Sequence, residues 1–125
     1  MVKIGLIGAG YMGGMHSACY EELKASGACV TAVADLREEK RKAAADRFGA
    51  VCYETGMELI EQADVDVIDI CLPTYLHTEH ALAAMKKRRA VFIEKPVCLT
   101  PEEGKRLLEA QKEYGAIVMV GQCIR

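Results

Sequence analysis

The sequence has no excess of positive charge, since 16 lysines and arginines stand against 18 aspartates and glutamates. This balance offers no basic surface for nucleic acid or for an anionic membrane. No run of apolar residues approaches the roughly 18 that a membrane-spanning helix needs. The first apolar stretch, Met1–Gly5, is too short for the apolar core of a signal peptide. We therefore expect a cytoplasmic protein that binds neither nucleic acid nor a membrane.

The six cysteines lack the spacing of a disulfide framework or of a metal site. They are scattered along the chain, without a C-x-x-C pair or a Cys/His cluster at zinc spacing. Cys71 ends an apolar run, and Cys19 and Cys29 have small or apolar neighbours, as buried free thiols do. We therefore predict packing cysteines in a reducing compartment, with neither a disulfide nor a bound metal.

Linkers, low-complexity stretches and internal repeats are also missing, and a length of 125 residues fits one domain. Six short runs rich in valine and isoleucine alternate with helical patterns along this length. Continuous apolar runs of this kind are typical of strands that are covered on both faces. The expected strands are Val2–Ile7, Cys29–Ala34, Ala50–Tyr53, Val65–Leu72, Ala90–Glu94 and Ala116–Val120.

The segments between these runs begin and end like helices. Thr55 and Thr100 each stand three residues before a glutamate, which is the spacing of a capping box, and a proline follows Thr100. Further helices are expected over Lys40–Phe48, closed by Gly49, and from a Thr74 cap to about Arg89. This alternation predicts an α/β fold, a doubly wound parallel six-stranded Rossmann sheet in the order 3-2-1-4-5-6 with helices on both faces. We expect it to be complete over residues 1–125.

A glycine-rich segment lies between the first expected strand and the first helix. It reads Gly8-Ala9-Gly10-Tyr11-Met12-Gly13, the pattern G-x-G-x-x-G. Gly8 permits a tight turn, Gly10 lets the backbone approach a pyrophosphate, and Gly13 lets the helix pack against the strand. The helix N-terminus offers free N–H groups and a partial positive charge, with Tyr11 and Met12 acting through their backbone amides. The segment therefore predicts dinucleotide binding.

Asp35 ends the second expected strand, 22 residues after Gly13. An acidic residue in this position accepts hydrogen bonds from the adenosine ribose hydroxyls, which favours NAD over NADP. Arg37 and Arg41 lie nearby and could partly accommodate a 2′-phosphate, so NADP stays possible. Asp35 also begins a capping-box pattern that ends at Glu38, and it could simply cap the second helix. Flavin- and S-adenosylmethionine-binding folds share the glycine loop and the acidic residue, so other residues must decide between these classes.

Two further segments follow the fourth and fifth strands, at the edge where doubly wound sheets bind ligands. They read Leu-Pro-Thr-x-x-His over residues 72–77 and Glu-Lys-Pro over residues 94–96. With the glycine loop and His16, these segments make the sequence closely resemble the glucose–fructose oxidoreductase/inositol dehydrogenase (Gfo/Idh/MocA) family. The resemblance covers essentially the whole chain, and it disfavours a methyltransferase or a flavoprotein.

The resemblance implies a domain that binds NAD(H) or NADP(H). His77 would lie close to the bound dinucleotide. The residues implied to lie at the nicotinamide end are Leu72, Pro73, Thr74, Glu94 and Gln122.

By the same resemblance, Lys95 contacts the reacting hydroxyl or carbonyl of the substrate, and a cis peptide before Pro96 would aim it. An ammonium group there stabilises negative charge that develops on the oxygen. Burial beside the positive nicotinamide could lower the pKa of Lys95 and help it carry protons. His16 is expected to pack or to hydrogen-bond locally, and the pair His77 and His80 lacks further ligands for a metal.

Members of this family carry a second, larger domain that supplies most substrate contacts, further catalytic residues and the oligomer interface, and this sequence shows no counterpart of it. We interpret the chain as the NAD(P)-binding domain of an oxidoreductase that transfers a hydride between NAD(P) and a carbinol of a sugar, polyol or related small molecule. Alone it should bind cofactor without turnover and expose apolar surface where the second domain would dock. Full-length members would be homo-oligomers. The alternative is a non-catalytic NAD(H)-binding module that senses redox state or regulates a partner, which Lys95 disfavours.

Overall fold

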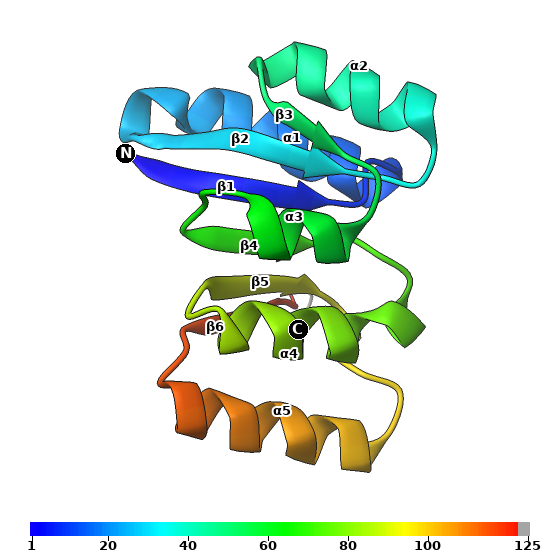
Figure 1. Cartoon of the computed structure of the whole chain (residues 1–125), viewed down its shortest axis with the longest axis vertical. Helices are drawn as coiled ribbons and strands as arrows, with labels where there is room; N and C mark the ends of the chain where they lie inside the picture. Colours follow the sequence, from blue (N-terminus) through cyan, green and yellow to red (C-terminus); the bar gives the residue numbers. More distant parts are fainter. Residues whose placement is uncertain (123–125) are drawn as a thin grey trace.

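Six parallel strands form one sheet in the structure, a computed structural model that describes residues 1–122 (Figure 1). The strands pair in the order β3-β2-β1-β4-β5-β6. This is the doubly wound order that the sequence predicts. The strands are β1 Val2–Ile7, β2 Ala28–Ala34, β3 Val51–Tyr53, β4 Val67–Ile70, β5 Ala90–Glu94 and β6 Val118–Gly121.

Four strands differ from their predicted bounds, and for β2 and β3 the difference is a single residue at the start. β4 spans Val67–Ile70 rather than Val65–Leu72, because its pairing with β1 covers only these residues and the buried Val65 serves packing alone. β6 begins at Val118 rather than at Ala116, whose N–H still bonds back to the carbonyl of Gln111 at the end of the preceding helix.

Helices connect the strands and begin mostly where the sequence predicts. Thr55 and Thr100 cap α3 and α5, since each side chain accepts the backbone N–H three residues on. Thr74 does not cap a helix, which corrects the prediction. The N–H of Leu76 bonds to the carbonyl of Pro73 and closes a short 3-10 turn, η2 Thr74–Leu76, before α4. The α-helices are α1 Tyr11–Leu23, α2 Glu38–Phe48, α3 Gly56–Gln62, α4 His77–Lys86 and α5 Pro101–Tyr114, and η1 Lys24–Ser26 follows α1.

None of the helices within residues 1–122 combines the length and the apolar character that crossing a membrane requires.

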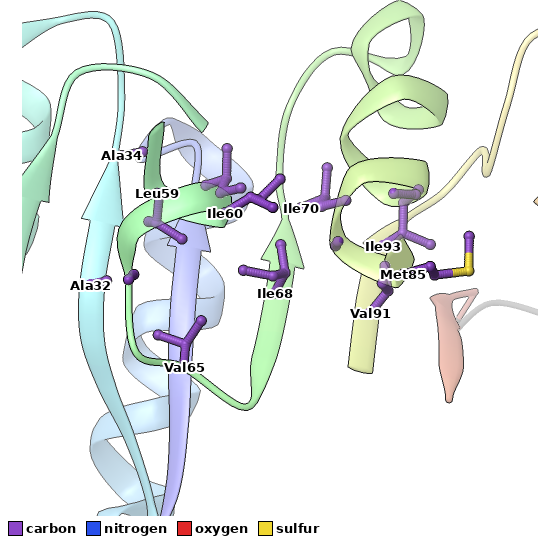
Figure 2. Packing of buried hydrophobic residues seen from close by; sticks show 14 of the residues in the cluster. Ala32, Ala34, Leu59, Ile60, Val65, Ile68, Ile70, Met85, Val91 and Ile93 are labelled. Atoms are coloured by element: carbon purple, nitrogen blue, oxygen red, sulfur yellow. The ribbon is translucent and has the colours of Figure 1, made fainter. Parts of the chain in front are cut away.

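Alternation along the strands divides their side chains between two apolar layers. Ile68, Ile70 and Ile93 point toward α3, α4 and α5, where they pack with Leu59 and Met85 (Figure 2). In Figure 1, α3 and α4 lie in front of the sheet and α5 lies below β6. The opposite face, covered by α1 and α2, holds a smaller cluster around Ile4, Leu6, Val30 and Val33.

Cysteines are less buried than predicted. Cys19 and Cys52 are exposed, because they lie on the outer side of α1 and on the short strand β3. Cys71, directly after β4, is half-buried. Cys123 lies outside the described residues.

Apolar side chains are exposed at the β6 end of the sheet. Ile117 is 75% exposed and Met119 is 66% exposed. Exposed apolar surface was expected for a docking face, and what covers it stays a prediction.

Replacing Leu59 with alanine tests the larger layer. Leu59 is fully buried between α3 and the sheet, so Leu59→Ala should lower the free energy of unfolding by about 2–5 kcal/mol. Leu36→Ala, at a position that is 73% exposed, is the matched control and should change it by less than about 0.5 kcal/mol. Urea denaturation followed by circular dichroism measures both, and equal effects would contradict the described core.

Candidate functional site

The glycine loop between β1 and α1 is pressed tightly against its neighbours. Gly8 has a φ of 96°, and a Cβ there would lie 2.5 Å from the carbonyl oxygen of Cys71. A Cβ on Gly13 would lie 1.9 Å from the carbonyl oxygen of Gly8. Side chains are therefore excluded at both positions, which agrees with the roles predicted for these glycines.

The N-terminus of α1 has no side chain that competes with a ligand. Gly10 is the N-cap, no side chain caps the helix, and the first turn carries no acidic residue. Its backbone N–H groups therefore lack intrahelical partners and carry the positive end of the helix dipole. Tyr11 and Met12, which begin the helix, expose their side chains. This end of α1 can receive an anionic group such as a phosphate.

Asp35 lies directly after β2 and faces this loop. Its carboxylate accepts the N–H of Ala9 at 2.8 Å. Its other partners all belong to Arg37, whose backbone N–H donates at 2.8 Å and whose guanidinium donates two bonds at 3.0 Å. Burial alone would raise the pKa of Asp35, but the hydrogen bonds from Arg37 and Ala9 outweigh it and lower the pKa. Asp35 is therefore a carboxylate at neutral pH.

The capping role considered for Asp35 is not realised. α2 begins at Glu38, and its N-cap is Arg37 without a side-chain cap bond. Asp35 instead binds the N–H two residues on, in a turn that precedes the helix. Arg41 supports this turn by donating to the carbonyl oxygens of Asp35 and Leu36 at 3.3 Å.

His77 joins the two segments that follow β4 and β5. The side chain is buried, with Nδ1 2.9 Å from the carbonyl oxygen of Pro96 and Nε2 2.7 Å from that of Leu72. It thus braces both loops of the sheet edge from inside, and its contact with a dinucleotide stays a prediction. The Lys95–Pro96 peptide is cis, as the resemblance implies.

The residues expected at the nicotinamide end differ in exposure. Glu94 is 8% exposed, whereas Lys95 reaches solvent directly beside it. Leu72 and Thr74 are half-buried, and Pro73 and Gln122 are exposed. All of these residues follow the carboxyl ends of β4, β5 or β6, so the fold brings them to one edge.

His16 packs against Phe92, as one of its two predicted roles requires, but its hydrogen bonds reach residues far away in the sequence. Its Nδ1 lies 2.7 Å from a carboxylate oxygen of Asp69 in β4, and its Nε2 lies 2.9 Å from Glu94 at the end of β5. The ring stacks on Phe92, with centroids 5.1 Å apart and an interplanar angle of 12°. Tyr20 donates to the same oxygen of Asp69 at 2.6 Å. His16 therefore connects α1 to β4 and β5.

This network was not predicted from the sequence, although one residue of the sequence, Asp69, indicates it. Asp69 is a carboxylate in the middle of an apolar strand, and it is fully buried. A buried carboxylate needs hydrogen-bond donors or a positive partner. The strand pattern could thus have indicated a partner, but it could not identify one 53 residues away.

The charges of the network follow from its contacts. The hydrogen bond to Asp69, aided by Glu94, raises the pKa of His16 although burial opposes it. Burial raises the pKa of the Tyr20 hydroxyl and of the Cys71 thiol, and the charge of Asp69 adds to both. Both groups stay neutral near neutral pH. Both ring nitrogens of His16 face carboxylate oxygens, an arrangement that favours the imidazolium, in which both nitrogens donate.

His16, Asp69 and Cys71 bring three potential metal ligands within 4.8 Å of one another. The 2.7 Å separation of Nδ1 and the carboxylate is a hydrogen-bond distance. Two ligands on one tetrahedral zinc ion stand about 3.3 Å apart, given bonds of about 2.0–2.1 Å. The geometry therefore favours a hydrogen-bond network.

The histidines of α4 are also engaged elsewhere. Nδ1 of His80 lies 2.8 Å from the carbonyl oxygen of Leu76, and burial lowers its pKa. Both nitrogens of His77 face the carbonyl oxygens described above.

Comparison with known proteins adds to this geometry. The Gfo/Idh/MocA oxidoreductase family, described as an NAD-binding Rossmann fold, matches residues 2–122. The chain belongs to this family. An inositol 2-dehydrogenase of Rubrobacter xylanophilus is 34% identical over 96% of the chain. The chain spans only 35% of the length of that relative.

Solved structures show the same fold with both nicotinamide cofactors. A levoglucosan dehydrogenase in complex with NADH and levoglucosan is 32% identical, with a TM-score of 0.85. The match covers 95% of this chain and 34% of the chain of the dehydrogenase. A biliverdin reductase from Synechocystis sp., in complex with biliverdin and NADP+, is 25% identical, with a TM-score of 0.86. The match covers 95% of this chain and 37% of the chain of the reductase.

The stability contribution of His16 should depend on pH. Because its folded pKa is raised above its unfolded value of about 6.5, the contribution is fully present below about pH 6.5 and is lost as pH rises through the folded pKa. His16→Gln should therefore cost about 3 kcal/mol at about pH 6, where it leaves buried carboxylates without their cation. The cost should shrink at alkaline pH.

Urea unfolding of the unmodified chain and of the His16→Gln variant, from about pH 6 to alkaline pH, measures the difference between their free energies of unfolding. Tyr20→Phe removes a neutral donor from the same carboxylate and serves as the matched control, with a cost that stays constant near neutral pH. A pH-independent cost of His16→Gln would contradict the imidazolium.

Proposed function

We propose that the chain binds NAD(H), and NADP(H) more weakly, as the cofactor domain of an oxidoreductase that acts on a carbinol of a sugar, polyol or related small molecule. The observation that carries this proposal is the carboxylate of Asp35, held 2.8 Å from the N–H of Ala9 in a glycine loop that excludes side chains. This arrangement supports an adenosine ribose at Asp35 and a pyrophosphate at the N-terminus of α1, contacting Gly8, Gly10 and the backbone of Tyr11–Gly13.

Arg37 competes with the adenosine ribose for the carboxylate of Asp35. Its guanidinium fills both oxygens of Asp35 that ribose hydroxyls would use, so the ribose must displace it. The displaced guanidinium, 55% exposed, then lies where a 2′-phosphate would approach and can bind it in a bidentate manner. Arg41 adds a second cation nearby. Asp35 itself repels the phosphate, which is why NADH remains the preferred ligand.

The nicotinamide end is assigned to Leu72, Pro73, Thr74, Glu94 and Gln122, with His77 bracing the loops beneath them. Lys95 stands at the same edge with its side chain in solvent, where a substrate can reach it. When bound, the nicotinamide would supply the acceptor for a hydride from the carbinol carbon, and the hydroxyl proton would pass to one of the remaining catalytic groups assigned below to protein outside this chain. The Lys95 ammonium stabilises the negative charge that develops on the oxygen. An exposed lysine at this place favours catalysis over a redox-sensing module.

The chain spans about a third of its relatives, and we assign substrate contacts, the remaining catalytic groups and oligomer formation to protein beyond residues 1–125. Nothing in its surface charge favours nucleic acid as a partner. The 125 residues alone should bind cofactor without turnover.

Gly10→Ala tests the pyrophosphate site. A Cβ at Gly10 would meet only a flexible Arg37 nitrogen at 3.4 Å, so folding should survive while the methyl group blocks the phosphate. NADH affinity, measured by isothermal titration calorimetry, should fall at least about tenfold, equivalent to about 1.4 kcal/mol. Gly14→Ala, with nothing within 4 Å of its Cβ, is the matched control and should bind like the unmodified chain. Equal binding by both variants would place the phosphates elsewhere.

Asp35→Ser combined with Leu36→Arg tests the cofactor preference. The change removes the charge that repels a 2′-phosphate and adds a cation for it, so the ratio of NADPH to NADH affinity should rise by at least about a hundredfold, or about 2.7 kcal/mol. Calorimetric titration with each cofactor gives the ratio. If NADPH gained nothing on NADH, the assignment of Asp35 would be wrong.

A further inference from the structure

Glu94 is the one carboxylate of the proposed nicotinamide end, and its contacts fix its position from several sides. One oxygen lies 2.9 Å from Nε2 of His16, and the other accepts the backbone N–H of Lys95 at 3.2 Å. A Cβ on Gly121 would lie 3.0 Å from the first oxygen, so β6 leaves no room on that side. Among these contacts, His16 provides the positive charge.

The His16 ring is itself held rigidly by other groups. Phe92 stacks against its face, and Asp69 binds its Nδ1. Tyr20 fixes Asp69 in turn by donating to the oxygen that the ring uses. A continuous chain of hydrogen bonds thus runs from the Tyr20 hydroxyl through Asp69 and His16 to Glu94.

We propose that His16, bridged between Asp69 and Glu94, is a positioning residue that holds Glu94 against the nicotinamide end of the cofactor, so that the grip on the nicotinamide weakens when His16 loses its proton. This inference rests on the proposed function, because it assumes that a dinucleotide occupies the site. It predicts that the affinity of the site for the nicotinamide end of the cofactor depends on pH, while the affinity for the adenosine end does not.

The two carboxylates do not share the effect of deprotonation equally. A neutral imidazole keeps one N–H, and its other nitrogen becomes an acceptor that faces a carboxylate. Asp69 is fully buried and makes the shorter bond, whereas Glu94 is 8% exposed. Asp69 also accepts from Tyr20, but its complete burial and its shorter bond to the ring favour keeping the remaining proton on Nδ1. The Glu94 oxygen that faces His16 then loses its donor, while the other oxygen keeps the N–H of Lys95.

The groups that face His16 come from three directions. Tyr20 belongs to α1, Asp69 and Cys71 belong to β4 and the residue after it, and Glu94 ends β5. Burial raises the pKa of Tyr20 and of Cys71, so both stay neutral in the range where His16 titrates. Gly121 of β6 contributes no charge. Because the hydrogen bond to Asp69 raises the pKa of His16 above its ordinary value, a fall in NADH affinity with rising pH is expected from His16 and not from Tyr20 or Cys71.

Comparing NADH with ADP-ribose isolates the nicotinamide end. ADP-ribose carries the adenosine, the pyrophosphate and the second ribose, but no nicotinamide. Titrations of the 125-residue chain from about pH 6.5 to about pH 9 should show NADH affinity falling about tenfold, the size expected for one hydrogen bond to a charged group. The affinity for ADP-ribose should stay constant over the same range.

His16→Gln and Tyr20→Phe separate positioning from general stability. His16→Gln should bind NADH weakly and without pH dependence, while its affinity for ADP-ribose stays that of the unmodified chain. Tyr20→Phe disturbs Asp69 but keeps the bond between His16 and Glu94, so the fall of NADH affinity with pH should persist. A pH effect that survives in His16→Gln, or one of equal size for ADP-ribose, would overturn the inference.

The unmodified chain provides a test that does not depend on a stable variant. The midpoint of the fall in NADH affinity should coincide with the titration of the His16 ring followed by nitrogen-15 NMR in the presence of NADH. Separate midpoints would overturn the inference while leaving the proposed function intact. Failure of both NADH and ADP-ribose to bind would instead overturn the proposed function, and the inference with it.

Discussion

Parallel pairing of all six strands is the constraint on which the rest of this structure depends. Because every strand runs in one direction, every segment that follows a strand emerges at the same edge of the sheet. The glycine loop, Asp35, the segment after Cys71 and the Glu94–Lys95 pair are far apart in the sequence, yet the fold brings them to one edge. Neighbouring strands set their distances, and the hydrogen bonds of Asp35 and His77 fix the loops between them.

Alternation of side chains along each strand adds a second constraint. Ile68 and Ile70 face the larger apolar layer, so Asp69 between them must face α1. The same reasoning places Glu94 on the α1 side, because its neighbour Ile93 packs toward α4. A charged pair of carboxylates thus meets His16 without entering the main core. Strand geometry, rather than any local motif, assembles this network.

Local sequence patterns predicted much of the fold, but they could not predict hydrogen bonds between residues far apart in the sequence. The glycine loop and the caps at Thr55 and Thr100 depend on residues close in sequence, and the order of the sheet follows from the regular alternation of strands and helices with right-handed crossovers. Thr74 failed as a cap because a 3-10 turn, closed by the carbonyl of Pro73, competes there with the helix start. The predicted site residues lie at one edge, but the partners of His16 depend on strand register, which no single segment encodes.

The two faces of the sheet differ in character, because one carries the larger apolar layer and the other carries the polar network around His16. The larger layer, built from α3, α4, α5 and the isoleucines of β4 and β5, is apolar, and His77 at the start of α4 connects it to the loops of the site. The polar network occupies the other face with α1. Substitutions that repack the first layer can therefore accumulate without disturbing the chemistry of the second. A lineage can adjust its thermal tolerance on one side of the sheet and its chemistry on the other.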